Sequence, residues 1–458
     1  MAAASPEHAD LIVIGSGQGG VPLATALAHQ GKRVVLFERG PFGGSCINVG
    51  CTPSKSFLAS AHTAGRARAA VPLGVHADVR VDQRAVFERL RRIRTNWSGL
   101  TERRLRDAGV EIVPAEARFV DVRTLAGGGR TIRADRVVID TGTSPRIPDI
   151  AGLRETPVLT NLTFFDQIEL PDVLLVLGGG YIGLELGQGA RRIGSAVTIV
   201  HGHDRLLERE EPDVSSIVQQ ALQDDGVRFV LNATVTSVAR ENGRLCVHLA
   251  DGQVLEGNAL LVATGRTPNT AALDLAASGI DCSGNGSVRV DDYLQTTCPG
   301  VYALGDVAGQ PAFTHVSFED HRRLLSTFAG SPRRRDDRVL SYAMFTEPQV
   351  GRTGHTEASA RAAGIAARSV TLPLSEVARA TEWNLLRGFF RLVVDERTDR
   401  IIGATFVSYE AGELIHVMVA HIEAQATWHV LERSMYIHPT LAEGLPSLAE
   451  LLTKAPNA

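Results

Sequence analysis

The feature that most constrains the fold is a glycine-rich turn between an apolar strand and a helix, a pattern that occurs twice. In the first copy, the apolar run 11–14 leads into the turn 15–20, and the next expected strand, 33–37, ends at Glu38. Such glycines let the backbone approach a pyrophosphate, while the helix N-terminus offers N–H donors and a positive dipole end. Glu38 lies 18 residues after Gly20, where a carboxylate can accept hydrogen bonds from ribose hydroxyls. The pattern predicts a dinucleotide-binding unit whose turn glycines are Gly15, Gly17 and Gly20.

The same pattern returns near the middle of the chain. The apolar run 173–177 precedes the turn 178–183, and the run 196–200 closes the unit. Two such units indicate two dinucleotides, or one that stays bound and one that diffuses. His201 lies 18 residues after the turn and takes the place that Glu38 has in the first unit. The turn glycines expected to approach the second dinucleotide are Gly178, Gly180 and Gly183.

A pair of cysteines, separated by four residues, follows the first unit. Cys46 and Cys51 lie in the segment 43–55, beside the place where a nucleotide would bind. Pro53 suits the first turn of a helix, because the N–H that proline lacks would be unpaired there. A thiol at the positive end of that helix has a pKa below the usual value of about 8.5, and Cys51 is the nearer of the two. Thiols so placed can take electrons from a bound redox cofactor and pass them on as a dithiol.

The composition excludes several classes of protein. A formal net charge of −4 over 458 residues is too small to indicate nucleic acid or an anionic membrane as a partner. The longest uncharged stretch, residues 11–31, is interrupted by five glycines, which is typical of a nucleotide fold and not of a membrane span. The N-terminus lacks a basic segment followed by an apolar core, so we expect no secretory signal.

Cysteine usage points to a reducing compartment. The chain has only five cysteines, an odd number that argues against a structural disulfide framework. Cys246, Cys282 and Cys298 lack the spacing of metal ligands, so we expect no metal site. We therefore expect a cytoplasmic protein in which any disulfide is catalytic.

The segments between and after the two units have patterns typical of helices, strands and turns. A helix-rich segment, 81–108, and a β-rich segment, 110–139, lie between the units, and a turn containing Gly142 follows. A similar strand and turn close the second unit at Gly265. A later strand delivers Asp306 to a glycine turn, where its carboxylate could bind another polar part of a cofactor.

The C-terminal part of the chain has a different pattern. Arginine-rich residues 331–338 are expected to form a linker. From residue 342 onward, expected strands at 389–394 and 401–406 alternate with helices such as 413–426. This alternation predicts a separate α+β domain.

In this order the motifs resemble those of the flavin-dependent pyridine nucleotide–disulfide oxidoreductases, which include dihydrolipoamide dehydrogenase, glutathione reductase and mercuric reductase. The resemblance covers essentially the whole chain and is most specific in the Cys-x4-Cys segment that ends Pro-Ser-Lys. Residues 313–320 are closest to mercuric-reductase-like and metal- or oxidant-resistance flavoproteins. The other motifs are the two glycine turns, Glu38, Ala263-Thr264-Gly265, Gly305-Asp306 and His438-Pro439-Thr440 with Glu443.

The resemblance implies an α/β fold with two Rossmann-like domains, the first for FAD and the second for NAD(P)H. A C-terminal α+β domain would form a homodimer. The implied boundaries are 1–148 and 267–335 for the FAD-binding domain, 149–266 for the NAD(P)-binding domain and 336–458 for the dimerisation domain.

The resemblance also assigns roles around the thiols. Cys51 would contact the flavin as a charge-transfer thiolate, and Cys46 would attack the substrate as the interchange thiol. Lys55 and Glu185 would pair beside the flavin N5. Tyr181, an aromatic residue in the second turn, can cover the flavin face and swing away when nicotinamide arrives.

Two histidines complete the implied site. His438 would exchange a proton with the interchange thiol of the other subunit, because imidazole titrates near pH 6.5, and Glu443 would polarise it. Thr440 and Glu443 also match a capping box for the final helix, a role that need not exclude the first. His315 lies near an expected helix start that would face the flavin pyrimidine.

The second unit bears on the choice of nicotinamide. His201 in place of a carboxylate removes repulsion against a 2′-phosphate, and Arg205 could pair with that phosphate. Against this, Gly183 and Gly187 stand where NADPH enzymes of the family often carry alanine. We lean slightly to NADPH.

We therefore expect a homodimeric, FAD-dependent NAD(P)H reductase of a small disulfide or a soft metal ion. Dedicated mercuric reductases usually carry another cysteine pair at the C-terminus, whereas residues 451–458 contain none, so the acceptor would have to reach Cys46 itself. The alternative within the class is dihydrolipoamide dehydrogenase. The alternative from another class is a redox-sensing flavoprotein that does not turn over.

Overall fold

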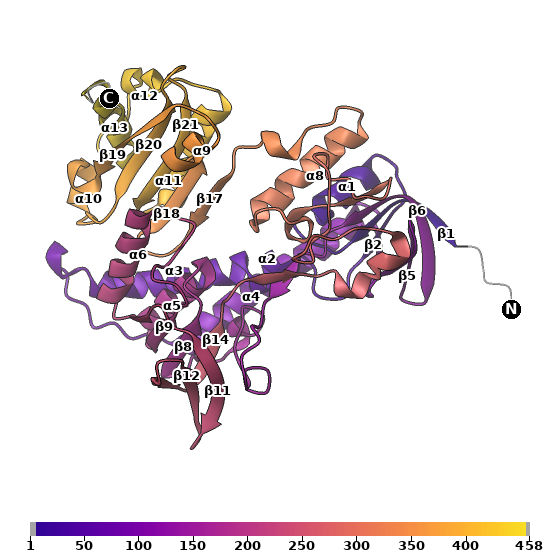
Figure 1. The fold of residues 1–458 in the computed structure, drawn as a ribbon, viewed down its shortest axis with the longest axis horizontal. Coiled ribbons are helices and arrows are strands. Elements are labelled where there is room, and N and C mark those ends of the chain that lie inside the picture. Colours follow the sequence, from indigo (N-terminus) through magenta and orange to yellow (C-terminus); the bar gives the residue numbers. More distant parts are fainter. Residues whose placement is uncertain (1–5, 455–458) are drawn as a thin grey trace.

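The computed structural model describes residues 6–454, and its lobes are arranged around the long helices α3 (Cys51–Arg68) and α4 (Gln83–Asp107) (Figure 1). Residues 1–5, part of the segment on which we base the expectation of no secretory signal, lie outside the described range. Residues 455–458, part of the cysteine-free C-terminal segment, also lie outside it. Helix α3 packs against both α4 and α5 (Tyr181–Ile193), so it connects the first glycine-turn unit to the second. No helix in residues 6–454 is both long and apolar enough to cross a bilayer.

The first sheet is a parallel core with an antiparallel extension, in the order β3-β2-β1-β6-β5-β4. The strand β16 also pairs with β6, in parallel, although about 160 residues separate them in the chain. This pairing brings the segment before Asp306 back to the first sheet. The bounds are β1 (Glu7–Ile14), β2 (Val34–Phe37), β3 (Glu111–Val113), β4 (Arg118–Asp121), β5 (Thr124–Gly127), β6 (Arg130–Ile139) and β16 (Val301–Ala303), with α1 (Gly20–His29) after the turn.

The second sheet is parallel, in the order β10-β9-β8-β14, and an antiparallel sheet of β11, β12 and β13 follows β10 in the chain. Strands β8 and β9 begin and end where the sequence predicted them. The bounds are β8 (Val173–Leu177), β9 (Ala196–Val200), β10 (Arg228–Val230), β11 (Val235–Glu241), β12 (Arg244–Leu249), β13 (Val254–Gly257) and β14 (Ala259–Val262), with helix α6 (Pro212–Asp224).

The two glycine turns have matching backbone geometry. Gly15 and Gly178 both have positive φ, +103° and +117°. A Cβ on either residue would lie 2.4 Å from a carbonyl oxygen, that of Asp140 in the first unit and that of Ala263 in the second. Both positions therefore require glycine, which is the physical reason for the repeat.

The C-terminal lobe is a five-stranded antiparallel sheet in the order β17-β18-β21-β20-β19, covered by helices (Figure 1). Its core includes Phe390 and Phe406, both fully buried, with ring centroids 4.7 Å apart. The predicted helix 413–426 is observed slightly earlier, as α11 (Ala411–Glu423). The other bounds are β17 (Ser341–Met344), β18 (Gln349–Gly354), β19 (Ala367–Pro373), β20 (Phe389–Asp395), β21 (Ile401–Ser408), α9 (Glu357–Ala362), α12 (His429–Arg433) and α13 (Gly444–Lys454). The α/β fold with a C-terminal α+β region is as predicted.

Candidate active site

The two cysteines lie on consecutive helices. Cys46 is half-buried on the short helix α2 (Gly44–Val49), and Cys51 is exposed as the first residue of α3, not just before it as the sequence suggested. The amide of Asn48 holds this segment in place, because its Nδ2 donates to the carbonyls of Phe42 (2.9 Å) and Gly44 (3.0 Å). Both cysteines are free thiols.

Electrostatics separate the two thiols. A hydrogen bond from the Cys46 thiol lowers the pKa of Cys51 to about 6, and the Thr314 hydroxyl, 3.1 Å from Cys51 Sγ, and the Lys55 charge act in the same direction. Partial desolvation of the Cys51 sulfur by neighbouring protein atoms and the charge of the Glu185 carboxylate oppose these effects. The pKa of Cys46 is raised, first by the hydrogen bond with Cys51 and then by burial. Cys51 is therefore the thiolate at neutral pH, and Cys46 keeps its proton.

Thr314 is a site residue that the sequence analysis did not single out. It begins helix α8 (Thr314–Phe328), 263 residues from Cys51. The only sequence signal was its place in the segment 313–320, next to His315.

Lys55 and Glu185 are brought together as expected from the resemblance. Lys55 Nζ donates to Glu185 Oε2 at 2.8 Å, and Glu185 Oε1 accepts from the backbone N–H of Phe345 at 2.8 Å. The ammonium also lies 4.6 Å from the centroid of the Phe345 ring. The buried carboxylate of Glu185 is thus fully paired, and it fixes the ammonium one helical turn from Cys51.

The first glycine turn has the features of a phosphate cradle. Glu38 Oε2 accepts from the Ser16 backbone N–H (2.8 Å) and hydroxyl (2.6 Å), which places this carboxylate at the turn. Beneath it, buried Asp140 accepts from the Gly20 N–H at 2.7 Å, and burial raises the pKa of Asp140 well above its usual value. Burial thus disfavours, at this turn, the negative charge that would repel a phosphate. The residues around the first turn therefore fit a dinucleotide.

The second turn repeats this arrangement with a different side chain. His201 Nδ1 accepts from the Gly179 N–H at 3.2 Å, the counterpart of the Ser16–Glu38 contact, and His201 Nε2 donates to the Arg205 carbonyl at 3.1 Å. Burial lowers the pKa of His201, which favours the neutral ring. The Arg205 guanidinium donates to carbonyls of its own loop, at Glu208 and Glu210. A Cβ on Gly180 would meet nothing within 4 Å, so the backbone there is open to a ligand.

Of four further predicted residues, Gly142, Gly265 and Asp306 lie where the first and second units join, and His315 contacts the start of the C-terminal lobe. Strand β7 (Thr143–Pro145) pairs with β15 (Arg266–Pro268), which brings the turns at Gly142 and Gly265 close together. Asp306 Oδ2 accepts from the Thr143 hydroxyl at 2.7 Å. His315 lies on α8, where its Nε2 donates to the Ser341 carbonyl at 2.6 Å and burial lowers its pKa.

Tyr181 is the first residue of α5, one turn before Glu185. Its ring lies 6.2 Å from that of Phe313 and 6.0 Å from that of Tyr342, measured between centroids. Its hydroxyl donates to the buried carboxylate of Glu210. The aromatic side chain is therefore held beside the thiol site by a partner that the sequence analysis did not identify.

His438 and Glu443 form a pair, but not beside the thiols of their own chain. His438 Nδ1 lies 2.8 Å from Glu443 Oε2, and the imidazole side chain is 74% exposed. Within residues 6–454, no hydrogen bond or ion pair joins it to Cys46 or Cys51. The capping-box interpretation is wrong, because the Thr440 hydroxyl donates to the Ile437 carbonyl and the Glu443 carboxylate goes to His438.

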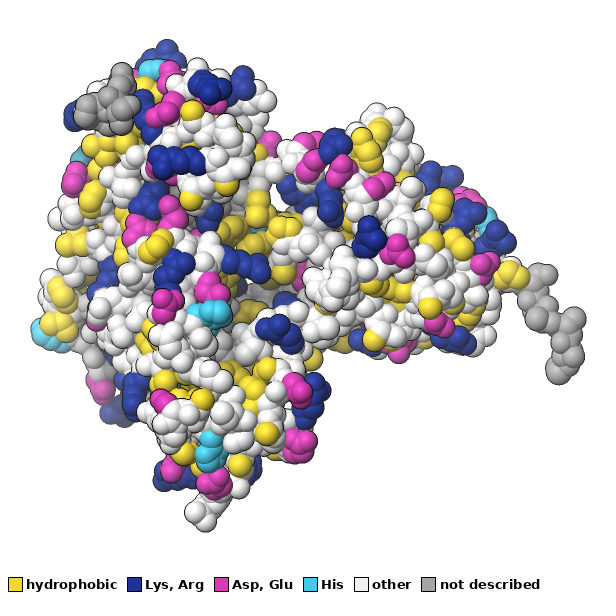
Figure 2. Space-filling model, in the orientation of Figure 1, with side chains coloured by type: hydrophobic (Ala, Val, Ile, Leu, Met, Phe, Trp, Pro, Cys, Tyr) yellow, Lys and Arg dark blue, Asp and Glu magenta, His cyan; other side chains and the backbone are white. Residues whose placement is uncertain are grey.

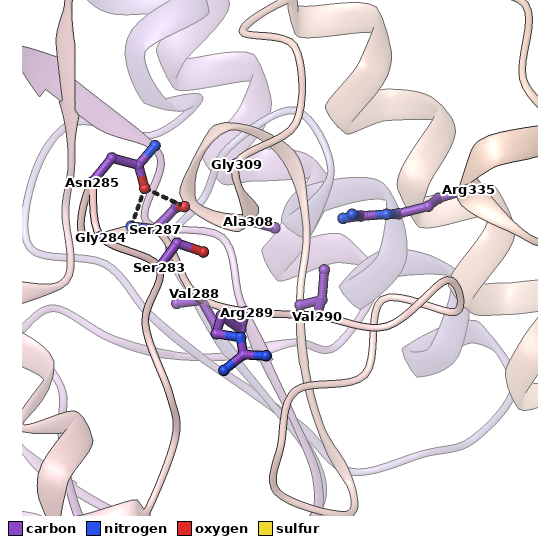
Figure 3. A pocket seen from close by; sticks show the side chains of 10 residues that line it. All are labelled: Ser283, Gly284, Asn285, Ser287, Val288, Arg289, Val290, Ala308, Gly309 and Arg335. Atoms are coloured by element: carbon purple, nitrogen blue, oxygen red, sulfur yellow. Dashed lines mark hydrogen bonds between the residues drawn. The ribbon is translucent and has the colours of Figure 1, made fainter. Parts of the chain in front are cut away.

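Two hollows in the surface were compared with the positions of the predicted site residues. Figure 2 shows one where the C-terminal lobe faces the lobe of the first sheet, with hydrophobic side chains in it. Another, of about 430 Å³, is lined by the segment 283–290, Ala308, Gly309 and Arg335 (Figure 3). None of the predicted site residues lines the second hollow.

Within the part of the chain that the structure describes, no group of three or more His, Cys, Asp or Glu could hold a metal ion.

Comparison with known proteins identifies the family. The family model for pyridine nucleotide-disulphide oxidoreductases matches residues 9–320, and that for the dimerisation domain of the same family matches residues 340–449. A mercuric reductase of Acidithiobacillus ferrooxidans is 33% identical over 97% of this chain and 82% of its own length. A dihydrolipoyl dehydrogenase of Haloferax volcanii is 33% identical over 96% of this chain and 95% of its own.

A solved structure agrees over almost the whole chain. The Cu(II) complex of RclA, an HOCl-induced flavoprotein disulfide reductase of Escherichia coli, superposes with a TM-score of 0.89 at 30% identity, covering 97% of this chain and all of RclA. The matched segments include both glycine turns, the cysteine pair and the C-terminal lobe. The chain belongs to the pyridine nucleotide-disulphide oxidoreductase family and is an FAD-dependent flavoprotein that uses NAD(P)H.

Proposed function

We propose that the chain, as a homodimer, delivers electrons from NAD(P)H to the Cys46–Cys51 pair and from Cys46 to a small disulfide or a soft metal ion. The observation that carries this proposal is the setting of the thiol pair: the Thr314 hydroxyl lies 3.1 Å from Cys51 Sγ, and the Lys55–Glu185 ion pair lies one helical turn along α3. When bound, FAD supplies the exchange of two electrons between nicotinamide and the thiol pair. Two electrons and two protons convert the disulfide into the two thiols.

The residues that would hold FAD surround the first turn. We assign its pyrophosphate to Gly15, Gly17 and Gly20 and its ribose to Glu38. Gly142, Asp306 and His315 would line the rest of the site, and Lys55, fixed by Glu185, would place a positive charge next to Cys51. The nicotinamide dinucleotide would bind at Gly178, Gly180 and Gly183, with His201 and Arg205 near its adenosine ribose and NADPH slightly favoured. We assign residues 1–148 and 267–335 to the FAD-binding domain, 149–266 to the NAD(P)-binding domain and 336–458 to dimerisation.

His438 would serve the thiols of the other subunit. Its Nδ1 faces Glu443, so its Nε2 is free to take the proton that Cys46 loses when its sulfur attacks an acceptor. Met435 and Ile437, which are 98% and 78% exposed beside it, suit a surface that a second copy covers. The expectation of a cytoplasmic location stays a prediction.

The acceptor can be tested with purified enzyme. Steady-state oxidation of NADH and of NADPH is measured with lipoamide, glutathione disulfide, Hg(II), Cu(II) and quinones, for the wild type and Cys46→Ser. The proposal predicts turnover with a disulfide or a soft metal ion that Cys46→Ser loses while its flavin stays bound. Retained disulfide reduction by Cys46→Ser would contradict the proposal.

The same experiment separates the alternatives. The relative named dihydrolipoyl dehydrogenase favours lipoamide as a second candidate acceptor, and failure to turn over lipoamide would remove it. Absence of sustained NAD(P)H oxidation with every acceptor would favour a redox-sensing flavoprotein.

A further inference from the structure

The carboxylate of Glu210 is the centre of a buried polar cluster that joins the second unit to the C-terminal lobe. Glu210 lies just before α6, and its Oε1 accepts from the hydroxyls of Tyr181 and Tyr342, the latter at 2.7 Å. Its Oε2 accepts from Arg352 Nη1 at 3.1 Å. Tyr342 and Arg352 are on β17 and β18, the strands of the C-terminal lobe that face α6 in Figure 1.

The charges in this cluster are balanced. The Glu210 carboxylate and the Arg352 guanidinium form an ion pair, and both side chains are largely shielded from water. Burial is the main cause that raises the pKa of both Tyr181 and Tyr342, and the Glu210 charge adds to it. Both hydroxyls therefore stay protonated and act as donors at neutral pH.

The cluster reaches the thiol site through aromatic rings. The ring of Phe313 stacks on that of Tyr342, with centroids 4.9 Å apart, and packs against Tyr181. The next residue, Thr314, contacts Cys51. Tyr181 itself precedes Glu185 by one helical turn, so it faces the same side of α5 as the carboxylate that pairs with Lys55.

We propose that Glu210 is a positioning residue whose hydrogen bond from the Tyr181 hydroxyl, here called the latch, holds the Tyr181 ring in front of the redox site. Through Tyr342 and Arg352, the same carboxylate connects Tyr181 to the C-terminal lobe. The inference rests on the proposed function, in which nicotinamide enters beside the second glycine turn. In that function Tyr181 covers the face at which nicotinamide binds, as the resemblance implies, so Tyr181 must move before the ring can reach its site. The movement breaks the buried hydrogen bond from Tyr181 to the charged Glu210 carboxylate. The latch therefore weakens nicotinamide binding, because only those molecules in which the Tyr181 ring has moved away can bind the nicotinamide ring.

Removing the latch should tighten nicotinamide binding. A hydrogen bond to a charged group corresponds to a change of about tenfold to a hundredfold in an equilibrium constant. In Tyr181→Phe the ring remains and the Glu210–Arg352 pair is untouched, so we expect the dissociation constant of the oxidised dinucleotide to fall by about tenfold or more. Glu210→Gln should act in the same direction. Tyr342→Phe should not, because it removes a donor that competes with Tyr181 for the same oxygen.

A neighbouring ion pair supplies the matched control. Glu211 Oε1 pairs with Arg391 Nη1 at 3.0 Å and joins the same two lobes without contacting Tyr181. Glu211→Gln should leave nicotinamide affinity unchanged, although it also removes one interdomain ion pair.

The experiment is a titration of the FAD-loaded enzyme with NAD⁺ and with NADP⁺, followed by the change in visible flavin absorption. Tighter binding in Tyr181→Phe and Glu210→Gln, but not in Glu211→Gln or Tyr342→Phe, supports the latch. Wild-type affinity in Tyr181→Phe, or equal effects of Glu210→Gln and Glu211→Gln, overturns it. If neither dinucleotide binds the wild type and neither reduced form bleaches its flavin, the proposed function fails and the latch fails with it.

Discussion

Replacing Thr314 by valine should raise the pKa of the Cys51 thiol while leaving the fold unchanged. Valine has nearly the shape of threonine but cannot donate a hydrogen bond, so the thiolate loses the hydroxyl that lies 3.1 Å from its sulfur. The hydrogen bond from Cys46 and the charge of Lys55 remain, and these still hold the pKa below its usual value.

The expected size of the change follows from the lost hydrogen bond. A hydrogen bond to a charged group contributes about 1.5 to 3 kcal/mol when buried, and solvent around the exposed Cys51 reduces this to about 1 kcal/mol. Since one pKa unit corresponds to about 1.4 kcal/mol, the pKa should rise from about 6 to about 6.7. At pH 6 the thiolate fraction would then fall from about one half to about one sixth.

The assay is the rate of alkylation by iodoacetamide of the reduced enzyme between pH 4.5 and 9, with the modified peptide identified by mass spectrometry. The other thiols react at higher pH, because burial raises the pKa values of Cys246, Cys282 and Cys298. Thr314→Ser keeps the hydroxyl and serves as the control. If the Thr314→Val profile overlies that of the wild type, or if Cys46 is alkylated at low pH in place of Cys51, the Thr314 hydroxyl does not stabilise a thiolate at Cys51.

Three other variants test separate parts of the site. Asp140→Asn should raise the thermal midpoint at pH values above the unfolded-state pKa of Asp140. Burial raises the folded-state pKa, so the wild type loses stability as pH rises from the unfolded-state pKa through the folded-state pKa. Thermal unfolding from about pH 4 upward should show a flatter pH dependence for the variant. Lys55→Met leaves the Glu185 carboxylate without its 2.8 Å partner, and because Lys55 is partly exposed we expect a loss of about 1 to 2 kcal/mol in denaturant unfolding, with slower flavin reduction. His438→Gln should slow reduction of the disulfide acceptor but leave flavin reduction by NAD(P)H unchanged in stopped-flow traces. Equal slowing of both steps would remove His438 from the proton transfer.

Local patterns in the sequence were enough to predict the two dinucleotide units. Glycine turns, the spacing to Glu38 and the apolar runs around them are short-range features, and β8 and β9 lie where the runs 173–177 and 196–200 placed them. The spacing that aligned His201 with Glu38 also holds in space, since each side chain accepts from the second N–H of its turn.

Local sequence patterns do not predict contacts between segments that are far apart in the chain. The Lys55–Glu185 pair, 130 residues apart, came from the resemblance and not from spacing. Thr314 and Glu210 were missed because their significance depends on which residues the fold brings to them. The proton-transfer role of His438 needs a second subunit, so neither the sequence nor a single chain tests it.

We predict that the thiol pair stores electrons in addition to those held by the flavin. Anaerobic titration of the oxidised enzyme with NADH or NADPH measures this directly, by flavin absorption and by counting free thiols. A flavin and a disulfide each accept two electrons, so the wild type should consume about two equivalents per subunit and Cys46→Ser about one. Consumption of a single equivalent by both proteins, with no new thiols in the wild type, would contradict the account.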